Sequence, residues 1–253
     1  MQTFKLTLEY DGSKFSGWQD QINARTVQGE LKQAAAELFR TEVEIQGAGR
    51  TDAGVHAVGQ VAHVKFRKGK AQISAAQMLR ELNDKLPSSI AITECEEATP
   101  RFHARHDAVS RAYFYQISTR KAALSKKFVW WIKEPLDIQK MQAAAALLPG
   151  RHDFHPFRAQ DPSKPDESTI VVVDSAEIAI DEHLVVFRIE ASHYLWRMVR
   201  RVTGVLVKVG KGEVSAKEFG TLLEGKPNPK FDIAAWTAPA AGLFLEGIRY
   251  GSK

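Results

Sequence analysis

The strongest constraint on the fold is the order in which apolar residues change their spacing along the chain. Every second residue from Phe4 to Tyr10 is apolar, which is typical of a half-buried strand. From Val27 to Leu38 the apolar residues recur at helical spacing instead. The same test, continued through the first part of the chain, predicts strands at 3–10, 43–45, 59–66 and 90–95 and helices at 27–38 and 74–86. This order is β-α-β-β-α-β.

The second part of the chain repeats this order. It predicts strands at 112–118, 170–180, 184–190 and 243–250, and helices at 137–148, about 194–209 and from 215. Two split β-α-β units in tandem, of the ferredoxin or RRM-like kind, explain the repeat. The expected class is therefore α+β, with mainly antiparallel sheets and halves of 1–105 and 106–253.

Composition and charge narrow the class of protein. The chain has 253 residues and a net charge of +5, with a pI of about 9.2, which favours a polyanionic partner. Its single cysteine, Cys95, predicts neither an internal disulfide nor a structural zinc site. No apolar run approaches the roughly 20 residues that cross a bilayer, and the first residues lack the pattern of a signal peptide. We expect a cytoplasmic protein.

The predicted helix at 194–209 has two faces. One face is an apolar stripe and the other is basic, formed by Arg197, Arg200, Arg201 and Lys208. A solvated face is the ordinary explanation of such a stripe. The absence of interleaved acids instead favours a surface that faces phosphates.

A glycine-rich segment at 47–56 lies between two predicted strands. It is not a Walker loop, because no Gly-Lys-Ser/Thr follows, and no helix opens at its end as a dinucleotide fingerprint requires. What distinguishes it is the acid Asp52, flanked by Arg50 and Thr51. Taken alone, Asp52 is better explained as a turn residue that caps its own backbone.

The segment as a whole resembles the central motif of the tRNA pseudouridine synthase A family. Further blocks resemble that family in the same order, at 10–19, 59–63, 102–115, 150–157, 198–210 and 242–245. The resemblance implies two related α+β halves whose sheets join around a central basic cleft, the first half carrying the catalytic loop and the second an RNA-binding helix. It also makes Asp52 the catalytic residue, Tyr113 a substrate-contacting tyrosine and Arg200 the partner of Asp52.

The implied reaction converts uridine to pseudouridine without a cofactor or metal. Asp52 would attack C6 of the base or C1′ of the ribose, or act as a base, and the sequence does not decide among these. A cationic neighbour such as Arg200 keeps a carboxylate ionised. Arg50 would contact the RNA backbone or fill the space of the extruded base, and Arg105 and Arg201 would add contacts to the RNA. Tyr113 would stack on the uracil, although a core aromatic residue is the alternative.

By resemblance, the substrates are uridines 38 to 40 in the anticodon arm of tRNA, bound by a homodimer. Two departures from the family are Tyr194, where phenylalanine is usual, and the lack of an arginine just before Ile170. A non-catalytic RNA-binding protein is the main alternative, but binding alone needs no carboxylate beside a phosphate-rich ligand. A hydrolase is a weaker alternative, because no second acid accompanies Asp52.

Overall fold

The computed structural model describes residues 1–67, 73–160 and 166–251. The chain divides into two compact units, Met1–Arg111 with Phe244–Lys253, and Ala112–Leu243. The last strand of the chain thus belongs to the first unit, whereas the division into 1–105 and 106–253 predicted from the sequence placed it in the second half. Phe244 and Leu245 pair with His56 and Ala57 in parallel, and this pairing explains the difference.

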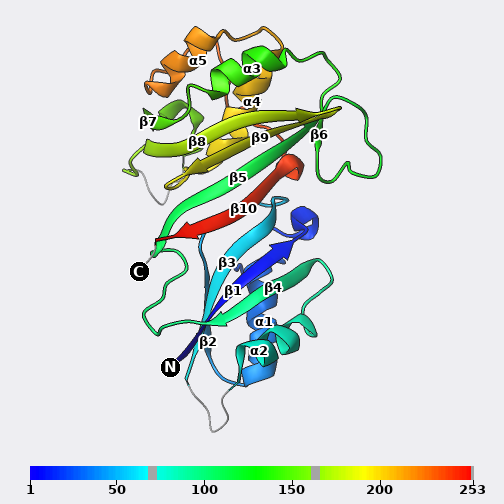
Figure 1. The fold of residues 1–253 in the computed structure, drawn as a ribbon, viewed down its shortest axis with the longest axis vertical. Coiled ribbons are helices and arrows are strands. Elements are labelled where there is room, and N and C mark those ends of the chain that lie inside the picture. The colour runs from blue at the N-terminus through cyan, green and yellow to red at the C-terminus, as the bar shows by residue number, and fades with distance from the viewer. Residues whose placement is uncertain (68–72, 161–165, 252–253) are drawn as a thin grey trace. The chain divides into compact units, whose positions relative to one another are not determined.

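The first unit combines a sheet with two helices (Figure 1). Its elements are β1 (Gln2–Tyr10), η1 (Gly12–Lys14), α1 (Val27–Phe39), β2 (Val43–Gly47), β3 (His56–Phe66), α2 (Ala75–Asn83), β4 (Ile90–Glu97) and β10 (Leu243–Tyr250). The strand order is β4-β1-β3, and these pairs are antiparallel. Strand β2 pairs antiparallel with the 62–66 end of β3, while β10 pairs with the 56–57 end.

Alternation and helix caps explain why these residues form these elements. Phe4, Leu6 and Leu8 are completely buried, as the period of two predicts. Helix α1 is capped by Thr26, whose hydroxyl accepts a hydrogen bond from the Gly29 amide at 3.1 Å. Helix α2 begins with the predicted capping box of Ser74 and Gln77.

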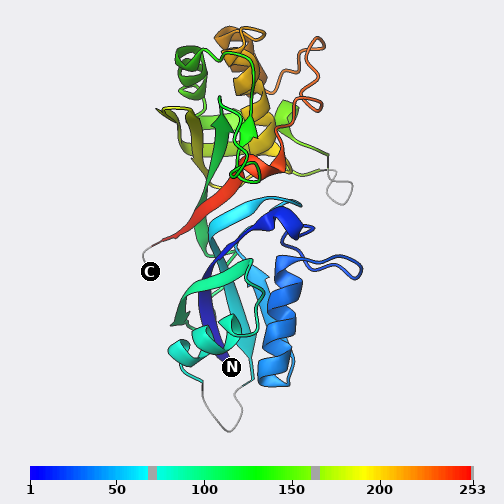
Figure 2. The same cartoon turned by 90° about the vertical axis from the view of Figure 1, so that its right-hand side faces the viewer.

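The second unit gathers three helices beside a sheet (Figures 1 and 2). Its elements are β5 (Ala108–Ser118), β6 (Trp130–Trp131), α3 (Ile138–Ala145), β7 (Gly150–Asp153), η2 (His155–Phe157), β8 (Ile170–Asp181), β9 (Leu184–Ala191), α4 (Met198–Gly210), α5 (Ala216–Leu223) and η3 (Ala240–Gly242). The strand order is β5-β9-β8-β7, with β6 paired to β5. The pairs β7–β8 and β8–β9 are antiparallel.

The α+β class is therefore confirmed, and the differences concern individual elements. Strands β6 and β7 were not predicted, because two and four residues are too few to show a period. Helix α4 begins at Met198, four residues later than expected, since Arg197 has a left-handed backbone with φ of 61°. No helix among the described residues is both long and apolar enough to cross a membrane.

The predicted two-faced character of α4 is only partly correct. The helix buries its expected stripe but also Thr203, Gly204, Val205 and Val207 on other faces. Gly204 packs so closely on the segment after α5 that an added Cβ would lie 1.8 Å from the carbonyl oxygen of Trp236. Only part of the basic stripe is consequently open to solvent.

Candidate active site

The loop that carries Asp52 connects β2 to β3. The amide of Ala48 donates to the Val61 carbonyl oxygen at 2.7 Å and fixes the start of the loop. The amide of Val55 donates to the carbonyl oxygen of Asp52 at 3.1 Å and closes the turn at the other end. Gly54 lies in that turn with φ of 78°, a conformation that favours glycine. The backbone on both sides of Asp52 is thus held in place.

A buried hydroxyl pair fixes the residue next to Asp52. The phenolic oxygen of Tyr10 lies 2.8 Å from the hydroxyl oxygen of Thr51. Burial raises the pKa of Tyr10 to about 12, so the phenol keeps its proton at neutral pH. The side-chain amide of Gln60 donates to the Tyr10 oxygen at 3.5 Å and to the Gly49 carbonyl oxygen at 2.9 Å. Strands β1 and β3 therefore both position this loop.

The segment after β1 packs directly against the same loop. The amide of Trp18 donates to the Thr51 carbonyl oxygen at 3.0 Å, and the amide of Gly54 donates to the Phe15 carbonyl oxygen at 3.2 Å. Gly17 has φ of 95°, and a Cβ added there would lie 2.6 Å from the Thr51 carbonyl oxygen. Only glycine allows the two segments to approach this closely.

The loop therefore holds one carboxylate in a defined place. Asp52 is half-buried, whereas Arg50 is exposed two residues earlier. Such an arrangement presents a nucleophile or base to a ligand without first having to order the backbone. Tyr10 and Gln60 were not predicted as supports of the site, because at the end of β1 and within β3 they resemble ordinary strand residues.

Arg105 lies in a second fixed segment of the same unit. It is exposed, and its carbonyl oxygen accepts a hydrogen bond from the Arg111 guanidinium at 2.8 Å. The same guanidinium donates to the Ala48 carbonyl oxygen at 3.1 Å. Arg111 thus links the Arg105 turn to the start of the Asp52 loop, a role that the sequence did not indicate.

The second unit contains the other predicted site residues. Arg200, in the first turn of α4, donates from Nε to the Ala238 carbonyl oxygen at 2.7 Å, and the Ala238 amide donates back to the Arg200 carbonyl oxygen at 3.0 Å. This reciprocal pair orients the guanidinium. Tyr113 on β5 is 7% exposed, and its ring meets Tyr194 edge to face with centroids 4.9 Å apart.

Arg201, Lys208 in α4 and Lys211 just after the helix are less available to an RNA than the sequence suggested. Arg201 is half-buried and donates to the Arg158 carbonyl oxygen. Burial, with Arg197 as a second cause, lowers its pKa. Lys208 forms an ion pair with Glu213 at 2.6 Å, and Lys211 forms one with Glu134 at 3.1 Å. The missing acids of the basic stripe are therefore supplied from outside the helix.

The predicted site residues are divided between the two units. The first unit contains Arg50, Asp52 and Arg105, and the second contains Tyr113, Arg200 and Arg201.

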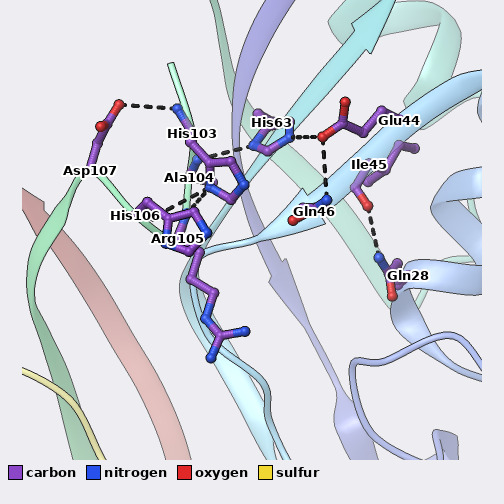
Figure 3. A network of polar contacts seen from close by, with 10 residues as sticks. All are labelled: Gln28, Glu44, Ile45, Gln46, His63, His103, Ala104, Arg105, His106 and Asp107. Atoms are coloured by element: carbon purple, nitrogen blue, oxygen red, sulfur yellow. Dashed lines mark hydrogen bonds and ion pairs between the residues drawn. The ribbon is translucent and has the colours of Figure 1, made fainter. Parts of the chain in front are cut away.

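Three further residues in the first unit raise the question of a metal. Among the described residues, Glu44, His63 and His103 offer ligand atoms that lie within 4.8 Å of one another (Figure 3). The Nδ1 atoms of both histidines, however, accept hydrogen bonds from backbone amides. A histidine that binds metal through Nε2 carries a proton on Nδ1 and donates it. The hydrogen bonds of the two histidines therefore do not suit the binding of a divalent metal ion by Glu44, His63 and His103.

Comparison with known proteins defines the class. A family model described as tRNA pseudouridine synthase matches residues 7–107 and 144–251. These ranges include Arg50, Asp52, Arg105, Arg200 and Arg201, whereas Tyr113 lies between them. The class is thus that of the pseudouridine synthases, which are isomerases.

Individual relatives narrow the class further. Proteins named tRNA pseudouridine synthase A from Bartonella tribocorum and Pelobacter propionicus are 37% and 39% identical over 252 residues, which cover 99% of this chain and 100% of each relative. A protein of the same name from Citrifermentans bemidjiense is 39% identical over 256 residues, which cover 100% of this chain and 99% of the relative. The chain belongs to the tRNA pseudouridine synthase A family.

Proposed function

We propose that this enzyme isomerises uridine to pseudouridine in tRNA with Asp52 as its catalytic residue. The observation that carries the proposal is the placement of Asp52, a half-buried carboxylate on a loop whose backbone is fixed on both sides. Membership of the family supplies the reaction and the substrate class.

The reaction requires little beyond one positioned carboxylate. The bond from N1 to C1′ breaks, the base turns, and a bond from C5 to C1′ forms; C5 releases a proton and N1 gains one. Asp52 assists by attacking C6 or C1′, or by acting as a base at the ribose. All three routes use the same ionised carboxylate, which a cationic neighbour stabilises.

Arg200 and Tyr113 complete the proposed catalytic set. Arg200 acts as the cationic partner of Asp52, and its Nε contact with Ala238 holds the guanidinium for that task. Tyr113 stacks on the uracil, an interaction worth about 1 to 3 kcal/mol per base. Its present partner is the ring of Tyr194, at the position where the resemblance to the family leads us to expect a phenylalanine.

The arginines contact the RNA outside the reacting base. Arg50 and Arg105 are exposed and suited to phosphates, and the alternative role of Arg50 is to fill the space that the extruded base leaves. Arg201 contacts the RNA through the guanidinium nitrogens that do not donate to Arg158. Each unit is a split β-α-β half, of which the first presents the catalytic loop and the second the RNA-binding helix.

The proposed substrates are uridines 38 to 40 of the anticodon stem-loop. A cytoplasmic homodimer binds one tRNA across both subunits, in keeping with the net charge of +5. A paired uridine must leave the helix at a cost of a few kcal/mol.

Mapping the product tests this proposal. Unmodified tRNA transcripts are incubated with the enzyme, and pseudouridine is located by carbodiimide labelling and primer extension. We expect stops at positions 38 to 40, and none in transcripts that carry cytidine there. Labelling elsewhere would overturn the anticodon assignment, and tRNA binding without any labelling would leave a non-catalytic RNA-binding protein.

A further inference from the structure

The turn that presents Arg105 is built around a histidine ring. Nδ1 of His103 accepts hydrogen bonds from the amides of Arg105 and His106, at 3.2 and 3.3 Å (Figure 3). The Asp107 carboxylate accepts from the His103 amide at 3.0 Å and closes the turn. His103 therefore holds the backbone of Arg105 directly.

A second histidine fixes the same turn from the sheet. His63 on β3 is completely buried, and its Nδ1 accepts from the Ala104 amide at 3.0 Å. Its Nε2 lies 3.1 Å from the Glu44 carboxylate. Because Nδ1 is an acceptor, the proton of the neutral ring sits on Nε2 and is donated to Glu44. The ring centroids of His63 and His103 are 4.7 Å apart.

The Arg105 side chain is exposed at this turn, as is His106. Figure 3 shows its guanidinium extending away from the three imidazole rings. The backbone of the turn is also held by Tyr250, whose hydroxyl donates to the Ala104 carbonyl oxygen at 2.7 Å. Five hydrogen bonds thus fix the backbone of residues 104–106, and Arg105 is the exposed arginine of this segment.

We propose that His63 and His103 are positioning residues that aim Arg105 at the phosphate backbone of the bound RNA. The inference rests on the proposed function and deepens it by naming the residues that place one RNA contact. Both rings act as neutral acceptors. Protonation at Nδ1 would place the new N–H opposite a backbone N–H, so the hydrogen bonds that hold the turn would be lost.

The surroundings of the two rings favour the neutral form. Burial lowers the pKa of His63, and Lys65 acts in the same direction against the opposing effect of Glu44. Burial also lowers the pKa of His103, with His63, His106 and Lys65 adding to it and Glu44 again opposing. The Asp107 carboxylate accepts a hydrogen bond from the backbone amide of His103. Both rings accordingly accept hydrogen bonds at neutral pH.

Paired substitutions distinguish positioning from general stability. Asparagine places its amide oxygen near the position of Nδ1, whereas glutamine reaches the position of Nε2. We expect His103→Asn to bind tRNA like the wild type and His103→Gln to bind several-fold more weakly, approaching Arg105→Ala. The same order is expected for His63→Asn and His63→Gln. His183→Gln, at an exposed turn of the second unit, is the matched control.

Salt dependence and coupling supply readouts that a merely structural role would not change. Loss of one phosphate contact reduces the magnitude of the negative slope of log K against log salt by roughly 0.7 to 0.9. We expect this drop for Arg105→Ala and His103→Gln, and no further drop when the two are combined. Equal binding by the Asn and Gln variants, or additive effects in the double variant, would overturn the inference. A normal slope for Arg105→Ala in an enzyme that still forms pseudouridine would overturn it while leaving the proposed function intact.

Discussion

The hydroxyl oxygens of Tyr10 and Thr51 lie 2.8 Å apart in the interior of the first unit. This contact ties the end of β1 to the residue that precedes Asp52. The position of the Asp52 carboxylate therefore depends on strand β1, Gln2–Tyr10.

Replacement of Tyr10 by phenylalanine should affect both stability and rate. It leaves the Thr51 hydroxyl without its buried partner, which destabilises by about 1 to 3 kcal/mol. We expect kcat to fall roughly tenfold, which corresponds to about 1.4 kcal/mol in the barrier, with the Kd for tRNA unchanged. Urea unfolding, single-turnover rates and filter binding measure the three quantities.

Thr51 supplies the matched test. Thr51→Ser keeps the hydroxyl and should retain most of the rate, whereas Thr51→Val should behave like Tyr10→Phe. Equal rates for the Ser and Val variants would show that the contact does not position Asp52.

Gly17 should tolerate no side chain. An alanine there adopts a left-handed φ and meets the Thr51 carbonyl oxygen at 2.6 Å, so we expect a loss of about 1 to 3 kcal/mol in unfolding free energy together with slower catalysis. Gly212→Ala is the control, because its φ is also positive but no atom lies within 4 Å. It should lose stability alone, as measured by urea unfolding beside the rate.

Acidification should destabilise the first unit through His63. Its native pKa is lowered from 6.5, so the unfolded chain takes up a proton that the folded chain refuses. This contribution to stability is complete above pH 6.5 and is lost as the pH falls below 6.5 toward the lowered native value. Urea unfolding at pH 7.5 and 5.5 should show a larger decrease for the wild type than for His63→Asn. Identical decreases would contradict the assignment.

Cys95 should react slowly with alkylating reagents. Burial, assisted by Glu96 and Glu97, raises the pKa of its thiol to about 12, and the thiolate is the reactive species. At pH 8 we expect iodoacetamide to modify the native protein roughly tenfold or more slowly than the urea-unfolded chain, as followed by mass spectrometry.

The sequence predicted the first unit well, for physical reasons visible in particular residues. Phe4, Leu6 and Leu8 alternate because one face of β1 is buried, and Ser74 with Gln77 marks the start of α2. The four-residue strand β7 shows no period and was missed. Strand β10 was found, but its pairing with β3 joins residues far apart in the chain, which local patterns do not record.

In the candidate site, too, contiguous residues could be predicted from the sequence and residues joined only by folding could not. The loop around Asp52 is recognisable because its residues are contiguous and their order is specific. The supports of that loop are not, since Tyr10, Gln60 and Arg111 come from three separate strands and are united only by folding. The pairing of Lys208 with Glu213 was missed for a related reason, because the acid lies just beyond the helix.

Tritium release tests the central claim, catalysis by Asp52, most directly. Isomerisation must expel the hydrogen from C5, so tRNA transcripts labelled at C5 of uridine report each turnover. We predict release by the wild type and none above background by Asp52→Ala or Asp52→Asn, with tRNA binding and the unfolding transition retained in both variants. Release by either variant at a rate close to that of the wild type would contradict the claim.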